Sequence, residues 1–560
     1  MGHPLPQRDS RDVSAPRVRI VLQARTGSRR LPAKSLLPLG GLPLAVLCAR
    51  RLGSTGREVV LATSTDASDD LLVALAAEYG MGTYRGSLAD VLQRFLSCTA
   101  DLGHEDIVVR ATADNPVPDG EFVDRLIQAF DAANTRYLGS SSPADGLPLG
   151  LSAEVFTAGA LRQAAREKRD AHVDEHVTPH LKAMTGDAGI VPRGMFFDAD
   201  RSSLRVTIDT LEDYLAMAAL FRRAGDAQRV PWRMLIELMA EPQSGDCRIA
   251  RRLVGAQHYS CITLGTAQLG MDYGITNSAG RPNDTEALAI VSTALEGGVT
   301  QLDTARAYGD AEKRLGRMLH RWPGYGMRVI SKLRPLTDLP DDAPRAVVEG
   351  AVDQSVRSSC SDLSRSRIDV MLFHRCADMF RWGGVALERL SEHVRNGTIG
   401  EIGASVYTPE EAVRSLGDPR ITQLQIPFNL LDQRWLEHEF QRAAAARRDL
   451  AIHARSVFLQ GLLLSEPGRW PSWADAAPRL CSDIRRLIGS FHRKCAADLC
   501  MAFVRAFPWI TSLVVGVESA GQLRELLSLA CTEPLSPAQA ALVRETFTDV
   551  PVRLLNPVLW

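Results

Sequence analysis

The chain has 560 residues, a length at which two or three domains are expected. Hydrophobic residues make up 45% and charged residues 23%, an ordinary composition for a globular protein with ample core. The 65 basic and 66 acidic residues leave a net charge of −1. This excludes an overall positive potential that would attract nucleic acid or an anionic membrane, so neither is expected as a partner.

Residues 1–17 are polar, contain proline and lack an apolar core. They are expected to form a flexible tail and not a secretory signal. No run of the chain approaches the length of a membrane span. The ten cysteines show no paired metal-ligand spacing, and we expect reduced, mostly buried thiols. These features predict a cytoplasmic protein.

Strand-like and helix-like segments alternate over residues 18–240. The β-branched run VRIVLQAR is followed by the helical LPLAVLCARRL, and EVVLATS then precedes the helical DLLVALAAEYG. Alternation of this kind predicts a parallel sheet covered by helices on both faces. Ligands of such sheets bind beyond the carboxyl ends of the strands, and polar loops lie there in this chain.

The first strand of this region runs into a basic loop, QARTGSRRLPAK. Gly27 and Ser28 can turn backbone N–H groups towards phosphate oxygens. Arg25, Arg29 and Lys34 add cations that could clamp a triphosphate. A loop of this composition is, taken alone, more often a solvated turn.

Two aspartates end later strands of the same region, Asp114 in DIVVRATAD and Asp209 in RVTID. Carboxylates on separate strand ends can seat Mg²⁺ when the phosphates of a substrate supply other ligands. The alternative is that each aspartate caps the turn or helix that follows, which is the commoner role.

Five segments, QARTGSRRLPAK, ATSTD, RATADNP, EHVTPH and TIDTLEDY, occur in the order in which one family has them. The region resembles the cytidylyltransferases that activate 3-deoxy sugar acids, which are CMP-Kdo synthetase-like, and most closely their spore-coat-polysaccharide-type branch. The resemblance implies a Rossmann-like nucleotidyltransferase domain that uses CTP, Mg²⁺ and a sugar acid. The implied phosphate-binding residues are Arg25, Gly27, Ser28 and Lys34, the implied Mg²⁺ ligands are Asp114 and Asp209, and the implied sugar-binding candidates are Glu154 and His176. It indicates the reaction class better than the substrate.

Periodicity fades over residues 241–258, where polar residues cluster. This predicts a linker, within which RIARRLVGA is compatible with a short helix.

Eight strand-like runs follow within residues 259–560, with helical segments between most of them. They are ITLG, TQLDT, VISK, VMLFH, EIGAS, QLQIP, AIHAR and LVVGV. Eight β/α units predict a (β/α)₈ TIM barrel, in which the strand ends share one face.

Four chemically active side chains stand where three of these runs, TQLDT, VISK and VMLFH, pass from strand to loop. Tyr308 has a hydroxyl that is a poor acid, with a reference pKa of about 10. The ammonium of Lys332 would favour the phenolate and lower that pKa, and Asp303 would keep the lysine charged and oriented. His374 could hydrogen-bond a carbonyl or help relay its proton. This set predicts general-acid catalysis on a carbonyl that receives a hydride.

The segments DTARAYGDAEKRLG, ISKL, DVMLFHR and IGAS occur in the order found in the aldo-keto reductases, which this part of the chain resembles. The resemblance implies a catalytic tetrad of Asp303, Tyr308, Lys332 and His374, with NADP(H) or NAD(H) as cofactor. It also implies that Ser405 and Gln425 bind the nicotinamide carboxamide. The stretch GVESAGQLRELL would hold the pyrophosphate and adenosine at a helix N-terminus. The positions concerned are Gly516, Ser519, Gln522 and Glu525.

Three residues depart from the family pattern. Val406 stands where many relatives have Asn. Arg455 stands where many have an aromatic side chain against the nicotinamide, and a flat guanidinium can stack there without being equivalent. Glu518 lies near the place where some relatives meet the 2′-phosphate with a cation. Like-charge repulsion there counts against a strong preference for NADPH.

The sequence therefore predicts a bifunctional enzyme of surface-glycan biosynthesis. One domain would transfer CMP from CTP to a sugar acid, and the other would interconvert a carbonyl and an alcohol with NAD(P)H. Two alternatives are a non-catalytic nucleotide-sugar-binding module attached to an active reductase, and a scaffold in which both halves serve assembly. The sequence identifies neither substrate, nor the oligomeric state.

Overall fold

The chain divides into two compact units, Met1–Ser244 and Gly245–Trp560. The computed structural model describes residues 16–140, 142–166, 178, 181–182, 185, 189–241, 248–275, 277, 280–323 and 325–556.

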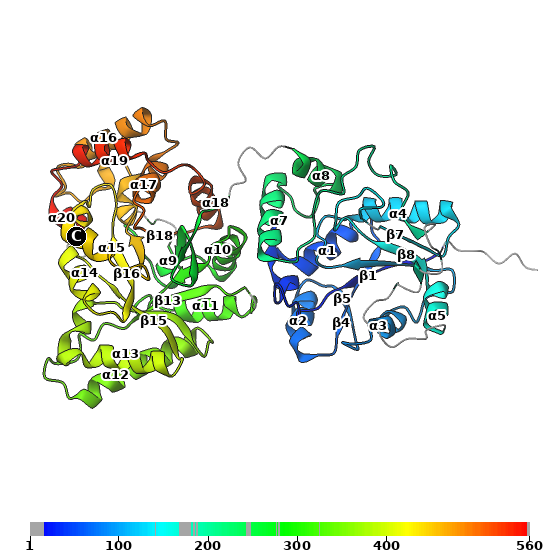
Figure 1. Cartoon of the computed structure of the whole chain (residues 1–560), viewed down its shortest axis with the longest axis horizontal. Coiled ribbons are helices and arrows are strands. Elements are labelled where there is room, and N and C mark those ends of the chain that lie inside the picture. Colours follow the sequence, from blue (N-terminus) through cyan, green and yellow to red (C-terminus); the bar gives the residue numbers. More distant parts are fainter. Residues whose placement is uncertain are drawn as a thin grey trace, which may run out of the picture. The chain divides into compact units, whose positions relative to one another are not determined.

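The first unit is built on a six-stranded sheet in the order β5–β4–β1–β6–β8–β7 (Figure 1). Strand β1 pairs in parallel with β4 and β6, and β4 pairs in parallel with β5. Strand β8 runs antiparallel to both β6 and β7. The strands are β1 (Val18–Gln23), β4 (Glu58–Ser64), β5 (Gly82–Gly86), β6 (Ile107–Thr112), β7 (Tyr137–Gly139) and β8 (Glu154–Thr157). The predicted mostly parallel sheet is confirmed.

Helices flank this sheet, and their apolar sides form its core. They are α1 (Leu44–Leu52), α2 (Asp70–Glu78), α3 (Val91–Cys98), α4 (Gly120–Ala133), α5 (Ala158–Arg166), α7 (Leu211–Ala224) and α8 (Trp232–Ala240). Phe95 of α3 and Leu161 of α5 are fully buried with Val21 of β1 and Val108 of β6 in one cluster. Burial of such apolar side chains is the main stabilising term for the sheet. This packing also fixes the positions of the strand ends from which the polar loops extend.

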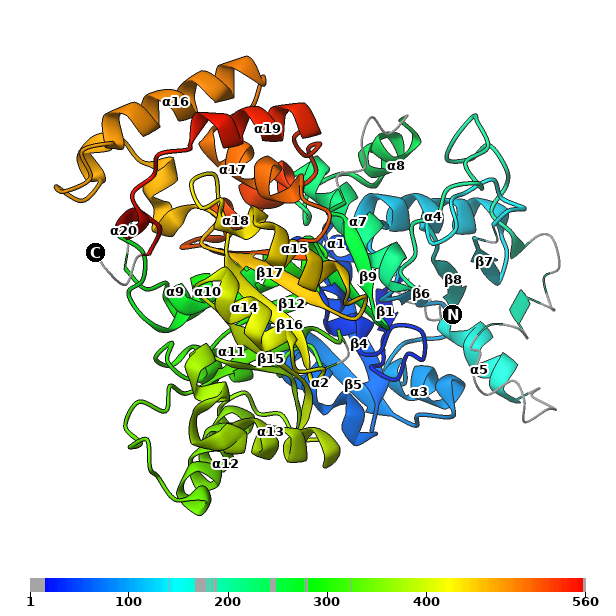
Figure 2. The ribbon, with the colours of Figure 1, turned by 60° about the vertical axis from the view of Figure 1, so that its left-hand side comes forward.

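The second unit is a closed barrel of eight parallel strands, β11 to β18, in chain order. Figure 2 shows the neighbouring strands β15, β16 and β17 side by side. The strands are β11 (Ile262–Gly265), β12 (Gln301–Asp303), β13 (Arg328–Leu333), β14 (Ile368–Phe373), β15 (Ile399–Ser405), β16 (Ile421–Pro427), β17 (Ala451–Arg455) and β18 (Ser512–Gly516). Each falls on one of the eight predicted runs, and the barrel prediction is confirmed.

Helices lie between and after the barrel strands. They are α9 (Ala267–Gly270), α10 (Asp284–Glu296), α11 (Ala311–Leu319), α12 (Arg345–Asp362), α13 (Val385–Arg395), α14 (Pro409–Leu416), α15 (His438–Ala445), α16 (Ala477–Ser490), α17 (Ala496–Arg505), α18 (Ala520–Leu529), α19 (Pro537–Thr546) and α20 (Val552–Leu555). Over the described part of the chain, none of the helices combines the length and apolarity that crossing a bilayer requires.

A β-hairpin precedes the barrel, where the sequence suggests a linker with a short helix. Strands β9 (Arg251–Val254) and β10 (Gln257–Ser260) pair antiparallel across a turn in which Gly255 has a φ of 57°. Glycine adopts this left-handed conformation without a steric cost, which favours the hairpin over a helix. The short-helix expectation for this segment is therefore wrong. Buried Tyr259 secures the hairpin to the barrel, because its hydroxyl accepts a hydrogen bond from Gln423 Nε2 at 2.7 Å.

Eight cysteines in the described residues are free, and five of these are buried. Cys531 is disulfide-bonded, so the expectation of reduced thiols is wrong at that position.

Candidate active sites

A buried carboxylate anchors the basic loop that follows β1. The Thr26 N–H and hydroxyl each donate a hydrogen bond of 2.8 Å to Asp69 Oδ1. Thr63 and Ser64, at the end of β4, donate to the other oxygen of Asp69. Burial alone would raise the pKa of Asp69, but these hydrogen bonds lower it overall. Sequence reasoning missed Asp69, which stands inconspicuously in the acidic run TDASDD.

The predicted phosphate-binding residues Arg25, Gly27 and Ser28 lie on the outer part of this loop. Arg25 and Gly27 are exposed, and Ser28 is half-buried. A Cβ atom added at Gly27 would meet no heavy atom within 4 Å, so packing within the chain does not require glycine there. The loop backbone is therefore open to an approaching ligand.

The two predicted Mg²⁺ ligands converge on the ammonium of Lys34. Lys34 Nζ lies 2.9 Å from Asp114 Oδ2 and 3.1 Å from Asp209 Oδ1, and it also donates to the Ile208 carbonyl at 2.7 Å. Arg30, which sequence reasoning missed, lies 3.0 Å from Asp209 Oδ1. The structure thus brings three of the predicted residues together and adds a fourth.

Capping does not account for Asp209. Thr210 caps α7: its hydroxyl accepts a hydrogen bond from the Asp213 N–H, and the Asp213 carboxylate accepts one from the Thr210 N–H. Asp209 is left to contact Lys34, Arg30 and Arg205. Burial would raise the pKa of Asp209, yet these cations, with Lys34 first among them, lower it. The carboxylate therefore stays charged.

The geometry between Asp114 and Asp209 fits a cation. Within the described ranges, no group of three or more His, Cys, Asp or Glu side chains could hold a metal unaided. Two carboxylates that already share one ammonium show that the point between them favours positive charge. Two carboxylates with phosphate oxygens as further ligands form a donor set suited to Mg²⁺.

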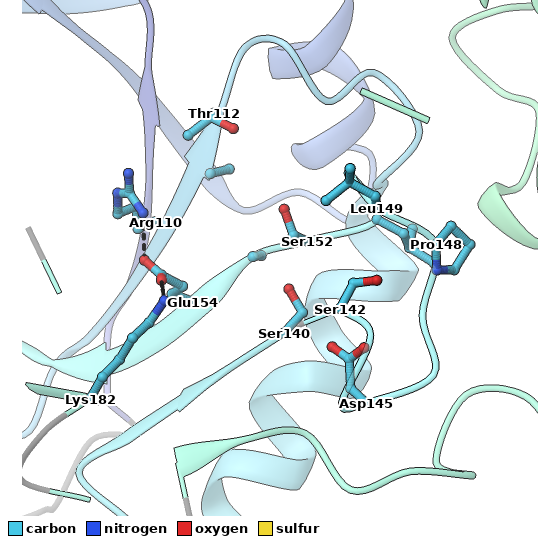
Figure 3. A pocket seen from close by; sticks show the side chains of 14 residues that line it. Arg110, Thr112, Ser140, Ser142, Asp145, Pro148, Leu149, Ser152, Glu154 and Lys182 are labelled. Atoms are coloured by element: carbon cyan, nitrogen blue, oxygen red, sulfur yellow. Dashed lines mark hydrogen bonds and ion pairs between the residues drawn. The ribbon is translucent and has the colours of Figure 1, made fainter. Parts of the chain in front are cut away.

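The same unit contains a cavity of about 290 Å³ with many polar residues in its lining (Figure 3). Its hydroxyl-bearing residues are Thr112, Ser140, Ser142 and Ser152. Asn115, next to Asp114, donates to Thr112 Oγ1 at 2.9 Å and to Ser152 Oγ at 3.0 Å. Asn115 thus connects two residues of the cavity lining to the segment that carries Asp114.

Glu154 lines this cavity, but its carboxylate is already engaged. It lies 2.6 Å from Arg110 Nη1 and 2.9 Å from Lys182 Nζ (Figure 3). It also accepts a hydrogen bond from the Tyr137 hydroxyl at 2.9 Å. Burial alone would raise the pKa of Glu154, but Arg110 and Lys182 lower it to about 2. The other predicted sugar-binding candidate, His176, lies outside the described residues.

In the second unit, a cavity of about 570 Å³ opens at the carboxyl ends of the barrel strands. All four residues of the predicted tetrad line it, and they come from the ends of three neighbouring strands: Asp303 and Tyr308 from β12 and its loop, Lys332 from β13, and His374 from the residue after β14. Lys332 Nζ lies 2.7 Å from both carboxylate oxygens of Asp303 and 3.3 Å from the Tyr308 hydroxyl. Asp303, Lys332 and Tyr308 thus form one hydrogen-bonded chain.

Burial sets the resting state of Tyr308. It raises the pKa of the phenol, and the charge of Lys332 opposes this effect without reversing it. Lys332 thus lowers this pKa as predicted, but the net shift is upward, because loss of water around a phenolate outweighs one nearby cation. The ammonium of Lys332 is itself stabilised: burial disfavours it, but Asp303 raises its pKa overall.

His374 stands beside Tyr308 and is uncharged. Its ring meets the phenol ring edge-on, with centroids 5.9 Å apart. Burial, followed by the charges of Lys332 and Arg455, lowers the pKa of His374 to about 3. Its Nδ1 is buried without a hydrogen-bond partner in the described structure. A neutral imidazole beside the phenol can donate to or accept from a substrate oxygen.

The predicted cofactor residues divide into those that line the barrel cavity and one that does not. Ser405, Gln425, Arg455, Gly516, Gln522 and Glu525 line it, as does Glu518. Gln425 Nε2 donates to Asp303 Oδ1 at 2.7 Å, which leaves its amide oxygen available for a carboxamide. Ser519 does not line the cavity, and it caps α18 by accepting from the Gln522 N–H.

A carboxylate occupies part of the expected anion site at α18. Glu286, on α10, accepts a hydrogen bond from the Ala520 N–H at 2.6 Å. That N–H belongs to the first turn of α18, where a phosphate was expected to bind. Glu286 comes from 234 residues earlier in the chain, and sequence reasoning missed it.

Comparison with protein families separates the chain into the same two parts. Residues 261–547 match the model of the aldo/keto reductase family, and residues 19–221 match that of the cytidylyltransferases.

Individual relatives match the first part. The spore coat polysaccharide biosynthesis protein SpsF of Bacillus subtilis is 33% identical over 39% of this chain and 92% of its own length. The 3-deoxy-manno-octulosonate cytidylyltransferase of Methylococcus capsulatus is 37% identical over 20% of this chain and 44% of its own length. Among solved structures, the aldo-keto reductase AKR11C1 of Bacillus halodurans is 18% identical, covers 53% of this chain and 96% of its own, and has a TM-score of 0.44.

Proposed function

The chain belongs to the aldo/keto reductase family through its second unit and to the cytidylyltransferases through its first, and from this we propose that it is one bifunctional enzyme. The first unit transfers CMP from CTP to a sugar acid with the help of Mg²⁺. The second reduces a carbonyl to an alcohol with NADH or NADPH. We further propose a cytoplasmic location, and a role in surface-glycan biosynthesis in line with the name of the SpsF relative.

In the barrel, Tyr308 gives its proton to the carbonyl oxygen. When bound, a reduced nicotinamide would supply the hydride for the carbonyl carbon. Lys332, held charged by Asp303, stabilises the phenolate that Tyr308 leaves behind. Neutral His374 orients the carbonyl oxygen towards the phenol. Ser405 and the free oxygen of Gln425 would hold the nicotinamide carboxamide.

In the first unit, Asp114 and Asp209 would hold Mg²⁺, which would neutralise charge on the nucleotide phosphates. Arg25, Gly27 and Ser28 would bind those phosphates, with Lys34 close by. The sugar acid would occupy the polar cavity of the same unit, whose hydroxyls suit a polyhydroxylated ligand. Glu154 would position Arg110 and Lys182 there, and would contact the ligand only through them.

One observation carries the reductase proposal, the hydrogen-bonded chain from Asp303 through Lys332 to Tyr308 in a cavity that also contains His374. To test it, the purified protein is given NADH or NADPH with a panel of aromatic aldehydes, and cofactor oxidation is followed. Cofactor oxidation with formation of the alcohol is expected. No reduction of any carbonyl by a folded protein that binds the cofactor would contradict it.

The transferase is tested by mass spectrometry of mixtures with CTP, Mg²⁺ and a panel of sugar acids. A CMP-sugar and released pyrophosphate are expected. Asp114→Asn should lose this activity while retaining carbonyl reduction, because Asp114 belongs to the other unit. If CTP binds but no sugar acid yields a CMP-sugar, the first unit is instead a nucleotide-sugar-binding module.

A further inference from the structure

The barrel cavity contains one cation whose charge no carboxylate neutralises. Lys332 is balanced by Asp303 at 2.7 Å, and His374 is uncharged. Glu518 and Glu525 lie at the β18–α18 end of the cavity. Arg455 ends β17, and in the described part of the chain it forms no ion pair.

Neutral partners hold the Arg455 guanidinium in place. Its plane lies over the Tyr407 ring, with Cζ 4.4 Å from the ring centroid. Nη2 donates to the Val406 carbonyl at 3.2 Å, and Nη1 lies 3.4 Å from Ser456 Oγ. A guanidinium has five N–H donors, so these contacts leave three for a ligand. The orientation of the guanidinium is therefore fixed, while part of its hydrogen-bonding capacity is unused.

Arg455 acts on the catalytic end of the cavity. Its charge is among the causes that lower the pKa of His374, after burial and Lys332. It also lowers the pKa of Tyr308, against the larger effect of burial. A substrate that fills the cavity removes water from this cation, and desolvation of an unpaired charge is costly. A substrate with its own negative charge avoids that cost.

We propose that Arg455 binds a carboxylate of the substrate, so that the barrel reduces an oxo acid in preference to a neutral aldehyde or ketone. A planar guanidinium matches a carboxylate with two parallel hydrogen bonds, which fixes the orientation of the neighbouring carbonyl. The reaction itself is unchanged: hydride from NADH or NADPH forms the new C–H bond, and the Tyr308 proton forms the O–H bond. The carboxylate is neither made nor consumed.

This inference rests on the proposed function and names the substrate class of its second activity. An acidic carbonyl compound is chemically close to the sugar acid proposed for the first unit. The reductase would then act on a precursor or relative of that acid, before or after another enzyme sets its remaining groups.

The test uses two probes that differ in charge and share one ketone, benzoylformate and its methyl ester. For the parent we expect kcat/KM for the acid to exceed that for the ester at least about tenfold. Arg455→Gln should reduce this ratio about 10- to 100-fold, mainly through KM for the acid, because hydrogen bonds to a charged group are lost. Arg455→Lys should retain part of the preference. Arg469→Gln removes an exposed arginine that does not line the cavity and should keep the parent ratio.

Measuring cofactor affinity distinguishes a substrate-binding role of Arg455 from stacking of its guanidinium on the nicotinamide. If Arg455→Gln weakens binding of NADH and NADPH and lowers kcat/KM for both probes equally, Arg455 serves the cofactor and the inference is wrong. A parent that reduces the acid and the ester equally well would also overturn it, while leaving the proposed reductase intact.

A binding measurement decides the inference if the parent reduces neither probe. Benzoate and benzamide are titrated into the cofactor-loaded protein by calorimetry. Binding of benzoate that exceeds binding of benzamide, and that Arg455→Gln abolishes, supports the carboxylate site. Equal binding, or none, refutes it, whatever the outcome for the reductase proposal.

Discussion

At the scale of single residues, the reductase depends on a phenol that burial keeps protonated. Burial raises the pKa of Tyr308 above its ordinary value, so the phenol is protonated at neutral pH. Lys332 acts after proton transfer, when a phenolate first exists beside its ammonium. The pair therefore combines a stable resting acid with a stabilised conjugate base.

Tyr308→Phe keeps the ring and removes the proton donor. Because general-acid catalysis typically contributes about 10²–10⁴-fold, kcat for aldehyde reduction should fall by a factor in that range. Melting temperature and cofactor affinity should hardly change. Steady-state kinetics with one aromatic aldehyde measure the effect, and an unchanged kcat would remove Tyr308 from the mechanism.

The pH dependence follows from His374, whose pKa is lowered to about 3 from an ordinary value near 6.5. The folded protein therefore keeps this imidazole neutral at pH 5–8, and kcat/KM should show no limb near pH 6.5. The unfolded chain binds a proton at His374 below about pH 6.5, so stability should decline as the pH falls from there towards 3. A limb near pH 6.5 that disappears in His374→Asn would show that the residue titrates during catalysis.

At the scale of secondary-structure elements, the barrel depends on close contact between strands. Gly403 lies at a shift of register in β15, between β14 and β16. A Cβ atom at Gly403 would overlap with the Gln423 backbone oxygen and with the Leu372 side chain. A side chain there would force neighbouring strands apart.

Gly403→Ala should lower the free energy of unfolding of the barrel by about 1–3 kcal/mol, the usual cost of overpacking. Gly350→Ala is the matched control, since a Cβ at that position in α12 meets nothing within 4 Å. The control should instead stabilise the helix by about 0.5–1 kcal/mol. Urea unfolding measures both, and equal effects of the two variants would mean that the Gly403 contacts are not limiting.

The barrel strands and their catalytic ends could be predicted from sequence, because the strands are short, largely buried runs and a polar residue stands at or next to the ends of β12, β13 and β14. Asp303, Lys332 and His374 can therefore be identified from the sequence. Contacts between residues far apart in the sequence cannot. Nothing local indicates that Glu286 holds the first turn of α18, or that Asp69 anchors the loop after β1. Likewise Arg30, and not its neighbour Arg29, is found beside Asp209, because loop geometry decides which cation turns inward.

At the scale of the whole chain, the two units have separate sheets and separate candidate sites. The hairpin at residues 251–260 belongs to the second unit, since β10 leads into β11 and Tyr259 is bonded to the barrel strand β16. A boundary near residue 244 leaves that hairpin intact.

Expression as residues 1–244 and 245–560 should give two soluble proteins, one that binds CTP and one that binds a nicotinamide cofactor. A second split between Val254 and Gln257 cuts the hairpin turn and should lower the melting temperature of the barrel half. Thermal unfolding and ligand titration of the four products provide the comparison. A barrel half from the first split that is unfolded or binds no cofactor would show that the units are interdependent.

The pairing of β11 with β18 also sets the order in which the two candidate sites can fold during synthesis on the ribosome. The sheet of the first unit has all its strands once Thr157 has been made, whereas the barrel ring cannot close before Ser512–Gly516 emerges. At roughly 5–20 residues per second, closure follows the first unit by some tens of seconds. Once Asp209 and the rest of the first unit have been made, a nascent chain can hold a nucleotide before the eighth barrel strand emerges.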